Sequence, residues 1–369
     1  HYAREMQRYA DVTVVVPEVP GEPFDDSIFP YRVVRCRAVR VPVLDYCLPV
    51  PLLDPSFLRE VQRIRFDVVH IHSPFPLGRL GYCLARKLRV PVAATVHSQY
   101  KQDLQRAVKS GALAGLMTRV LLRVFTQCDA FFTVNHAMAR ICRDEYGFPR
   151  LPEIVPNATD MRPLGGPGEK AVREFGLASD ECVFLFVGRL NDLKNIFLIA
   201  KSLKIVKERT DRPFRMVFAG TGQDEGRLRR MIRRFGLGEQ TVFTGNITDR
   251  TLLAALYARA DLMLFPSLYD TSSLVQVEAA SQGTAALYVR GAVTAESVAE
   301  NVNGFLADND PEAYAEAVLA LMADPDRLRE AGENARRDLY VSWKDVARTV
   351  FRRYRDLVRE YRAKGSLRA

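Results

Sequence analysis

The sequence predicts two doubly wound α/β domains that follow one another along the chain. Its 369 residues are too many for one compact core and fit two domains of ordinary size. Short apolar runs alternate with helical patterns from end to end, which is typical of parallel βαβ units. The densest group of turn residues covers residues 162–168, and we place the domain boundary there.

We therefore predict an N-terminal domain over residues 1–162, a C-terminal domain over residues 163–342, and a closing helix over residues 343–369 that returns to the first domain. In the first domain, apolar runs predict strands at residues 12–16, 67–71, 91–96, 130–134 and 153–155. Helical patterns between them cover residues 55–64, 78–88, 104–125 and 137–146.

In the second domain the same alternation has sharper boundaries. Strands are predicted at residues 183–187, 215–219, 241–244, 261–265 and 284–288. Helices are predicted at residues 195–209, 225–235, 249–258, 273–282, 311–322, 325–339 and 344–364. Several of these strands end at glycine or a polar loop, where doubly wound folds bind their ligands.

The composition is that of a soluble globular protein, with 48% hydrophobic and 26% charged residues. No apolar run reaches the roughly 18–20 residues that span a bilayer. The six cysteines form no C-x-x-C pair, which argues against a zinc site or a disulfide framework. We expect a cytoplasmic protein, with peripheral contact to the inner face of the membrane as a further hypothesis.

The net charge of +9 leans toward the first half, where residues 1–165 hold 22 Lys and Arg against 16 Asp and Glu. Such a surplus fits a protein that touches anionic lipid, nucleic acid or phosphorylated substrates. A solvated, arginine-rich surface explains it equally well. Because the basic residues form no stripe interleaved with aromatic side chains, we expect no nucleic-acid partner.

Two cations follow the first predicted strand of the second domain. Arg189 comes directly after Gly188 at the strand end, and Lys194 stands just before a helix. Both would project at the C-terminal edge of the sheet, beside a helix N-terminus that also favours anions. An arginine fork and a lysine point charge suit a diphosphate. Two solvated loop cations are the alternative interpretation.

A second polar segment follows the strand that ends near residue 265. Ser273-x-x-Gln276 has the pattern of a capping box that opens a helix. The free amides of Ser272, Ser273 and Leu274 would then face the crevice and bind an anion or sugar oxygens.

Two carboxylates lie on either side of this helix start. Asp270 comes just before it, and Glu278 follows about one and a half turns inside. They can hold hydroxyl groups on either side of a bound phosphate. A capping Asp with a surface Glu is the alternative, but Glu278 stands among apolar residues, where an unpaired carboxylate would be costly.

These two segments together resemble glycosyltransferase family four, whose pattern is G-R-x4-K-G/N followed further along the chain by E-x7-E. The likeness covers most of the chain and includes residues 67–72, 95–98, 155–157, 218–222 and 303–306. It implies the GT-B fold, in which two Rossmann-like domains face each other across a cleft. It also implies that the donor is a nucleoside diphosphate sugar, most often a UDP- or GDP-sugar.

The resemblance implies a role for each matching residue of the donor's phosphate end. Arg189 and Lys194 would bind the diphosphate and stabilise charge on the leaving phosphate, with Gly188 and Gly220 at the adjoining strand ends. Ile247 would lie near the nucleobase.

The remaining roles concern the two sugars of the donor. Glu278 would take the ribose hydroxyls, and Asp270, where the family has its first glutamate, would contact the donor sugar ring beside the amides of residues 272–274. His97 corresponds to the family histidine that reaches the donor sugar. The catalytic set is thus Arg189, Lys194, Asp270 and His97.

Two departures from the family pattern stand out. Asp270 is one methylene shorter than glutamate, which changes its reach by about 1.5 Å, so the family's pattern does not by itself predict the donor sugar. The sequence begins inside the family's first helix, at His1, and we expect the family's first strand and glycine-rich loop to belong upstream of it.

Three residues of the first domain are candidates for the acceptor side, namely His72, Tyr100 and Lys101. Residues 104–125 could form a helix that lies on a membrane. A core-facing helix with a charged outer side explains the same pattern and is our preferred interpretation.

We predict a retaining hexosyltransferase that acts on an acceptor hydroxyl of a glycolipid or a surface polysaccharide. No cofactor or metal is expected, because no D-x-D pair follows a strand and the two cations can stabilise the charge. Retention by front-face attack is favoured, since the resemblance assigns Asp270 to ring hydroxyls rather than to a nucleophile. The alternatives are a GT-B sugar-nucleotide epimerase and a non-catalytic sugar-nucleotide binding protein.

Overall fold

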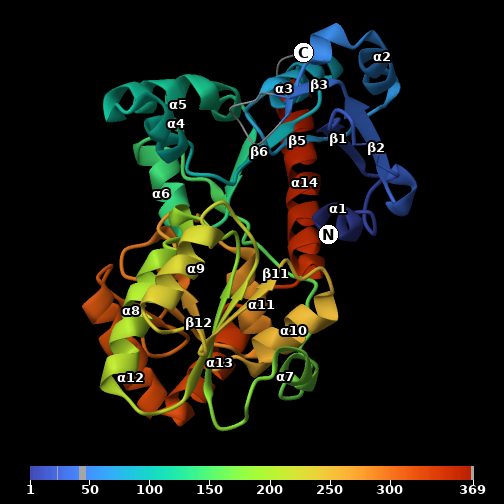
Figure 1. Ribbon diagram of the computed structural model, residues 1–369. Helices are drawn as coiled ribbons and strands as arrows, with labels where there is room; N and C mark the ends of the chain where they lie inside the picture. Colours follow the sequence, from blue (N-terminus) through green and yellow to red (C-terminus); the bar gives the residue numbers. More distant parts are fainter. Residues whose placement is uncertain (23, 41–46, 367–369) are drawn as a thin grey trace. The chain divides into compact units, whose positions relative to one another are not determined.

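The computed structural model describes residues 1–22, 24–40 and 47–366 (Figure 1). The chain divides into two compact units, one formed by His1–Pro156 with Trp343–Ala369 and the other by Asn157–Ser342. The division thus falls after Pro156, where the sequence placed it after residue 162. The reason is local: Thr159 forms a β-bridge with Ser342, and its N–H donates to the Val341 carbonyl at 3.0 Å, so these residues pack with the end of the second unit.

The second unit contains a six-stranded parallel sheet in the order β11-β10-β9-β12-β13-β14. Its strands are β9 (Cys182–Val187), β10 (Phe214–Ala219), β11 (Thr241–Gly245), β12 (Leu262–Phe265), β13 (Ala286–Val289) and β14 (Phe305–Ala307). From β9 the chain adds strands on one side as far as β11, and then returns to add β12 to β14 on the other side. The order therefore reverses between β9 and β12, which is where open α/β sheets bind their ligands.

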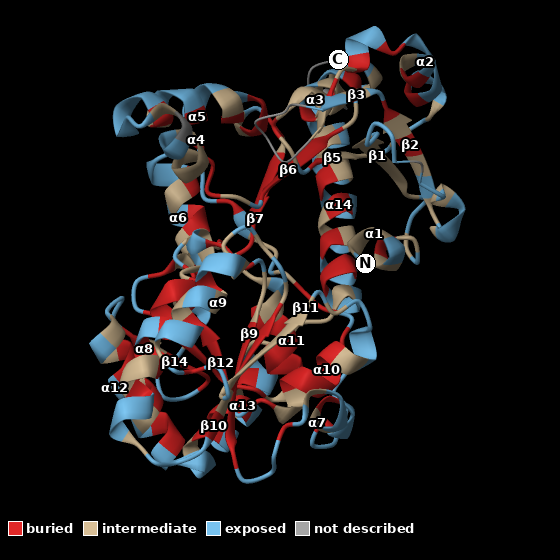
Figure 2. Cartoon of the chain, viewed as in Figure 1, coloured by how far each residue is buried: buried red, intermediate tan, exposed pale blue. Residues whose placement is uncertain are grey.

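Helices cover both faces of this sheet (Figure 2). They are α7 (Glu169–Phe175), α8 (Ile196–Arg209), α9 (Glu225–Arg234), α10 (Arg250–Arg259), α11 (Leu274–Gln282), α12 (Pro311–Ala323) and α13 (Pro325–Asp338). Side chains along a strand alternate between the two faces: Phe184 and Phe186 join a core with α8, α9 and α12, whereas Val183 and Leu185 join a core with α7, α10 and α11.

The predicted elements of this unit are confirmed, with ends that agree within two residues. The prediction missed α7 and β14. Both are short, at seven and three residues, and a pattern of that length does not stand out from loop sequence.

The first unit contains a four-stranded parallel sheet in the order β5-β6-β7-β8. Its strands are β5 (Val69–Ile71), β6 (Val92–Val96), β7 (Ala130–Thr133) and β8 (Glu153–Ile154). Two strand pairs stand apart from it, the parallel pair β1 (Thr13–Pro17) and β2 (Arg32–Cys36), and the antiparallel pair β3 (Ala38–Arg40) and β4 (Cys47–Pro49). The sequence did not predict β2, β3 or β4, because arginines interrupt the apolar residues of β2 and β3, and β4 is only three residues long and ends in proline.

The helices of this unit are α1 (Tyr2–Met6), α2 (Pro55–Arg63), α3 (Pro76–Leu88), α4 (Tyr100–Val108), α5 (Gly111–Thr126), α6 (His136–Asp144) and α14 (Trp343–Ser366). The single helix predicted over residues 104–125 is wrong, since the chain breaks between α4 and α5. Lys109 adopts a left-handed conformation with φ 54°, and the Ser110 side chain then caps α5 by accepting from the Leu113 N–H. A serine followed by glycine was the signal for this break.

The half-buried residue His70 ties β5 to the rest of the first unit. One ring nitrogen lies 2.6 Å from the Thr95 hydroxyl on β6, and the other bonds to the Tyr354 hydroxyl on α14, which in turn lies 3.0 Å from the Tyr2 hydroxyl on α1. Burial, followed by the charges that His72 and His97 would carry, lowers the pKa of His70 well below its usual value. His70 is therefore neutral in the folded protein at pH 7.

This neutral histidine predicts a pH dependence of stability. Below about pH 6.5, His70 of the unfolded chain binds a proton that His70 of the folded protein does not bind. The contribution of neutral His70 to the free energy of unfolding is therefore complete above that pH and is lost as the pH falls. The free energy of unfolding should decrease by as much as about 1.4 kcal/mol per pH unit for this one proton. Fluorescence of Trp343, the single tryptophan and a residue of the first unit, reports the transition.

The His70→Gln variant should show a shallower slope between pH 7 and pH 5. His136, an exposed residue at the start of α6, provides the matched control, and His136→Gln should keep the wild-type slope. Equal slopes for wild type and His70→Gln would contradict the assignment.

Candidate functional site

The loop that carries the two predicted cations is held by backbone contacts with the loop after β10. The Gly188 N–H donates to the Ala219 carbonyl at 3.0 Å, the Leu190 N–H donates to the Thr221 carbonyl at 2.9 Å, and the Asp224 N–H donates to the Leu190 carbonyl at 3.0 Å. These bonds continue the β9–β10 pairing beyond both strand ends, so the chain that leads to Lys194 starts from a fixed frame.

Two glycines make this close approach possible. Gly220 has φ +136°, and a Cβ added to it would lie 2.0 Å from the Gly188 carbonyl oxygen. A Cβ on Gly222 would lie 2.3 Å from the Leu190 carbonyl oxygen. Both contacts are with backbone atoms that cannot rotate away, so the two loops can meet only where side chains are absent.

The cations sit at the reversal point of the sheet. Arg189 is exposed and Lys194 is half-buried. The short 3-10 turn η3 (Asp192–Lys194) ends at Asn195, whose φ is 57° and whose side-chain amide donates to the Pro266 carbonyl at 3.3 Å. This bond joins the cation loop after β9 to the loop after β12.

Across this junction, Lys194 and Asp270 form an ion pair. The Lys194 Nζ lies 2.5 Å from Asp270 Oδ1, and the two side chains are 20% and 15% exposed. The other carboxylate oxygen, Asp270 Oδ2, is buried and has no hydrogen-bond partner. The structure thus brings together two residues that the sequence assigned to separate motifs.

Further buried oxygens without partners gather in the same place. Of the five such side-chain atoms among the described residues, Ser267 Oγ and Asp270 Oδ2 lie in the loop between β12 and α11, and a third, Oγ1, belongs to Thr294, whose backbone carbonyl accepts from Gln276 of α11. A buried polar atom is normally bonded to protein, water or ligand. Their concentration here indicates a surface built to receive a polar ligand.

The amides at the start of α11 are oriented by a residue from the beginning of the unit. The Asn157 side chain donates to the Ser272 carbonyl at 2.8 Å. Because the carbonyl and the N–H of one planar peptide point in opposite directions, this bond turns the Ser273 N–H away from Asn157. Within the described part of the chain, the N–H groups of Ser272, Ser273 and Leu274 donate to no protein acceptor.

The predicted capping box is wrong. The Ser273 side chain accepts no hydrogen bond from the first turn of α11. The Gln276 amide instead donates to the Thr294 carbonyl at 3.3 Å and to the Ser297 hydroxyl at 3.1 Å. Gln276 thus bonds to residues after β13 instead of capping the helix, and the amides at the helix start are left open.

Glu278 is buried but has partners, which removes the interpretation as a surface residue. Arg250 Nη2 lies 2.8 Å from one carboxylate oxygen, and the Tyr257 hydroxyl donates to the other at 3.1 Å. Burial, together with the charge of Glu278, raises the pKa of Tyr257 well above its usual value, so the phenol stays protonated and donates. The sequence prediction missed Arg250 and Tyr257, although both lie on the helix that follows Ile247.

The other donor-side residue, Ile247, lies in the loop between β11 and α10. It is half-buried and packs against the core on the α10 side of the sheet. Its assigned role at the nucleobase stays a prediction.

The candidates of the first unit lie after β5 and β6. His72 Nδ1 and His97 Nε2 are 2.9 Å apart, and the His72 ring stacks on His70 with 4.1 Å between centroids. Desolvation and then the charge of a protonated His97 lower the pKa of His72, and desolvation lowers that of His97. The facing nitrogens lie within hydrogen-bonding distance of each other.

Tyr100 and Lys101 are already engaged by the protein. Tyr100 is 9% exposed and belongs to the hydrophobic core of the first unit. Lys101 Nζ lies 2.6 Å from Glu145. The acceptor roles of these two residues and of His72 and His97 stay predictions.

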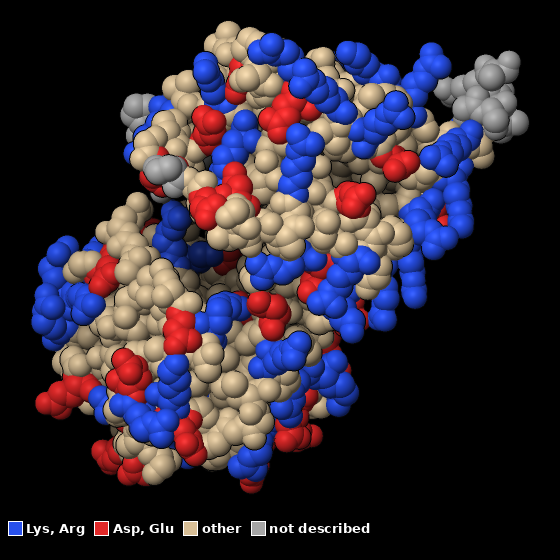
Figure 3. Space-filling view, turned by 90° about the vertical axis from the view of Figure 1, so that its right-hand side faces the viewer, with Lys and Arg blue, Asp and Glu red and all other residues tan. Residues whose placement is uncertain are grey.

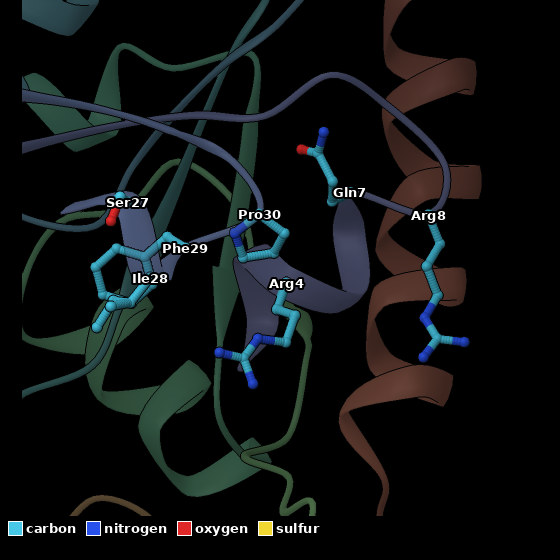
Figure 4. A pocket seen from close by; sticks show the side chains of 7 residues that line it. All are labelled: Arg4, Gln7, Arg8, Ser27, Ile28, Phe29 and Pro30. Atoms are coloured by element: carbon cyan, nitrogen blue, oxygen red, sulfur yellow. The ribbon is translucent and has the colours of Figure 1, made fainter.

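A separate pocket of about 610 Å³ opens in the first unit between α1 and the segment around Ile28 (Figure 4). Its lining residues are Arg4, Gln7, Arg8, Ser27, Ile28, Phe29 and Pro30. None of them is a predicted site residue. On the face drawn in Figure 3, lysines and arginines are interspersed with acidic residues rather than gathered in one patch, which agrees with a solvated basic surface there.

Comparison with known proteins gives two adjoining family matches. Residues 1–162 match the model described as Glycosyltransferase Family 4, and residues 168–338 match the model described as Glycosyl transferases group 1.

Curated relatives match over most of this chain. A D-inositol 3-phosphate glycosyltransferase of Catenulispora acidiphila is 31% identical over 73% of this chain. An alpha-monoglucosyldiacylglycerol synthase of Streptococcus pneumoniae is 22% identical over 88% of it. The chain spans about two thirds of the length of these relatives, 66% and 70% respectively.

Solved structures share the fold. A sucrose-phosphate synthase from Thermosynechococcus elongatus gives a TM-score of 0.75 at 20% identity and covers 96% of this chain and 91% of its own. An Anabaena protein solved in complex with UDP-glucose gives a TM-score of 0.69 at 16% identity and covers 92% and 98%. These likenesses confirm the predicted GT-B fold.

The loop contact beneath the cations can be tested by one added methyl group. Gly222→Ala should lower the free energy of unfolding of the second unit by about 1–3 kcal/mol, because the new Cβ meets the Leu190 backbone. For a unit of this size that corresponds to a fall in Tm of roughly 2–10 °C, measurable by calorimetry.

Gly238→Ala is the matched control. A Cβ there meets nothing within 4 Å, and its Tm should stay within about a degree of the wild type or rise slightly. A Gly222→Ala transition indistinguishable from that of Gly238→Ala would show that the two loops do not pack as described.

Proposed function

This chain belongs to glycosyltransferase family 4, and from that premise we propose that it transfers a hexose from a nucleoside diphosphate sugar to an acceptor hydroxyl with retention of configuration. The observation that carries the proposal is the pair Lys194–Asp270 at the reversal point of the sheet. It places a cation for a phosphate beside a buried carboxylate oxygen that lacks a partner. A ligand with a phosphate on one side and hydroxyl groups on the other satisfies both.

The diphosphate of the donor is the group that Arg189 and Lys194 would bind. As the bond between the sugar and the phosphate breaks, negative charge develops on the leaving phosphate, and the two fixed cations stabilise it. Amides that donate to no protein acceptor at Ser272, Ser273 and Leu274 supply further donors for phosphate or sugar oxygens.

The sugar ring is assigned to Asp270. Lys194 pairs with Oδ1, and Oδ2, which has no partner in the protein, is the oxygen that would accept from a sugar hydroxyl. This supports a binding role rather than a nucleophilic one, and with it retention by front-face attack, in which the departing phosphate takes the acceptor proton. His97 completes the proposed set on the family's pattern.

The ribose is assigned to Glu278. Arg250 and Tyr257 hold its carboxylate in place, and each carboxylate oxygen keeps a second lone pair for a ribose hydroxyl. The Anabaena protein that shares this fold was solved with UDP-glucose, which supports a UDP-sugar as the first donor to examine.

The acceptor is proposed to be a hydroxyl of a glycolipid or a surface polysaccharide. One relative is named as an inositol phosphate glycosyltransferase and another as a glucosyldiacylglycerol synthase, which supports a hydroxyl acceptor that can be lipid-linked. Peripheral contact with a membrane follows from a lipid-linked acceptor. Among the described residues, no helix is long and apolar enough to cross a bilayer.

Turnover should depend on both cations. A charge-assisted contact contributes about 1.5–3 kcal/mol, so Arg189→Ala and Lys194→Ala should each reduce kcat/KM for the donor by about tenfold to over a hundredfold. Lys201, an exposed lysine on α8, supplies the control Lys201→Ala, which should leave kcat/KM unchanged. Normal donor turnover in both site variants would remove the diphosphate assignment.

The stereochemical outcome is read from the same reaction. NMR of the product should show the anomeric configuration of the donor, and an inverted product would overturn the retaining mechanism. Consumption of the donor without any acceptor, to give an epimerised sugar nucleotide, would identify an epimerase instead.

Nucleotide binding should depend on Glu278. With the bare nucleoside diphosphate in a calorimeter, Glu278→Gln should bind at least about tenfold more weakly, because one charge-assisted contact to the ribose is lost. The matched control is Glu181→Gln, a second buried glutamate of this unit that pairs with Arg215 away from the loops after β9 and β12. Equal affinity of Glu278→Gln and wild type would take Glu278 out of the ribose role.

A further inference from the structure

Helix α5 presents an unusual outer surface. Leu113, Leu116, Met117 and Val120 are 47%, 60%, 38% and 58% exposed; we call these four residues the α5 stripe. At about 100° per residue they fall within an arc of roughly 100°, so they form one continuous apolar face. Figure 2 shows the exposed outer side of α5.

The opposite face of the same helix holds it to the unit. Ala114, Thr118, Leu122 and Phe125 are fully buried, and Leu122 and Phe125 belong to the core of the first unit. The preferred interpretation of this segment, a core-facing helix with a charged outer side, is therefore right for the inner face and wrong for the outer one. Packing within the unit does not require the α5 stripe to be apolar.

Positive charge borders the α5 stripe. Arg119 and Arg123 are exposed and follow its edge one turn apart, and exposed Lys109 precedes the helix. Residues 111–126 contain no acidic residue. The nearby acids are already paired, Asp103 with Arg106 at 3.7 Å and Glu145 with Lys101 at 2.6 Å.

We propose that the α5 stripe is a docking surface for an anionic lipid membrane, with α5 lying in the plane of the interface. In this arrangement the apolar face would contact the acyl chains, and the arginines at its border would contact the negatively charged headgroups. A second copy of this chain fits less well, because an antiparallel pairing of two α5 faces would bring the arginines of both copies together. The inference rests on the proposed function only in that a lipid-linked acceptor would be presented at such a surface.

Vesicle binding tests the proposal with the full chain. Flotation with vesicles of phosphatidylcholine containing one third phosphatidylglycerol should carry the protein, and pure phosphatidylcholine vesicles should carry at least tenfold less. The double variant Leu116→Gln/Val120→Gln should lower partitioning at least tenfold. Arg119→Gln/Arg123→Gln should lower it as well and reduce its dependence on salt.

Matched controls come from the second unit. Val302 is 45% exposed, and Arg233 and Arg234 are exposed neighbours on α9. Val302→Gln and Arg233→Gln/Arg234→Gln should partition as the wild type does. Circular dichroism and thermal stabilisation by UDP-sugar should be unchanged in all four variants.

Three outcomes would overturn the inference. These are wild-type protein that ignores anionic vesicles, stripe variants that bind as well as wild type, and a dimer in analytical ultracentrifugation that Leu116→Gln/Val120→Gln dissolves, which would assign the stripe to a second copy. Failure of the proposed function is distinguishable, because it would abolish sugar-nucleotide stabilisation and turnover while leaving vesicle binding intact.

Discussion

The donor-side geometry depends on one contact, the approach of two backbones where β9 and β10 end. The Gly188 carbonyl oxygen occupies the place that a Cβ on Gly220 would need, and backbone bonds continue across the loops on either side of it. Because this frame is made of main chain, it does not depend on side-chain rotamers. The backbone hydrogen bonds of this frame therefore fix the position of Lys194 at the reversal point of the sheet. The charge of the lysine side chain is not needed to place it there.

Upon that frame, two carboxylates are arranged in different ways. Asp270 has one oxygen paired with Lys194 and one buried oxygen without a hydrogen-bond partner, which leaves an acceptor for the proposed ligand. Glu278 has both carboxylate oxygens hydrogen-bonded, to Arg250 and Tyr257, so its position is set by the protein before any proposed ligand binds. Asp270, proposed for the sugar, thus has an acceptor still to be satisfied, whereas Glu278, proposed for the ribose, is already held in place by protein partners.

Much of this arrangement could be predicted from the sequence, because the ends of the strands in the second domain are clearly marked. Glycine after β9, a lysine before α8 and a helix start after Asp270 mark where strands end, and parallel strands end at one edge. The partners of the carboxylates could not be found in this way. Arg250 meets Glu278 across 28 positions of sequence, and such a pairing depends on how α10 packs on α11, about which local pattern says nothing.

The same limit explains the two errors of local interpretation. A capping box at Ser273 is favoured by local spacing. The buried Gln276 amide instead finds acceptors at Thr294 and Ser297, and a buried amide left without acceptors costs more than a lost cap contributes.

In α5, hydrophobic periodicity reports that a face is apolar and is silent on what covers it. Two apolar faces on one helix, Leu122 on the inner side and Leu116 on the outer, read in sequence as one broad stripe. Only the fold separates the face that the protein buries from the face that it leaves for another surface. Since the inner face already anchors the helix, packing within the unit gives no reason for leucine on the outer face, and the arginines that border this face are what favour the proposed anionic membrane as its partner.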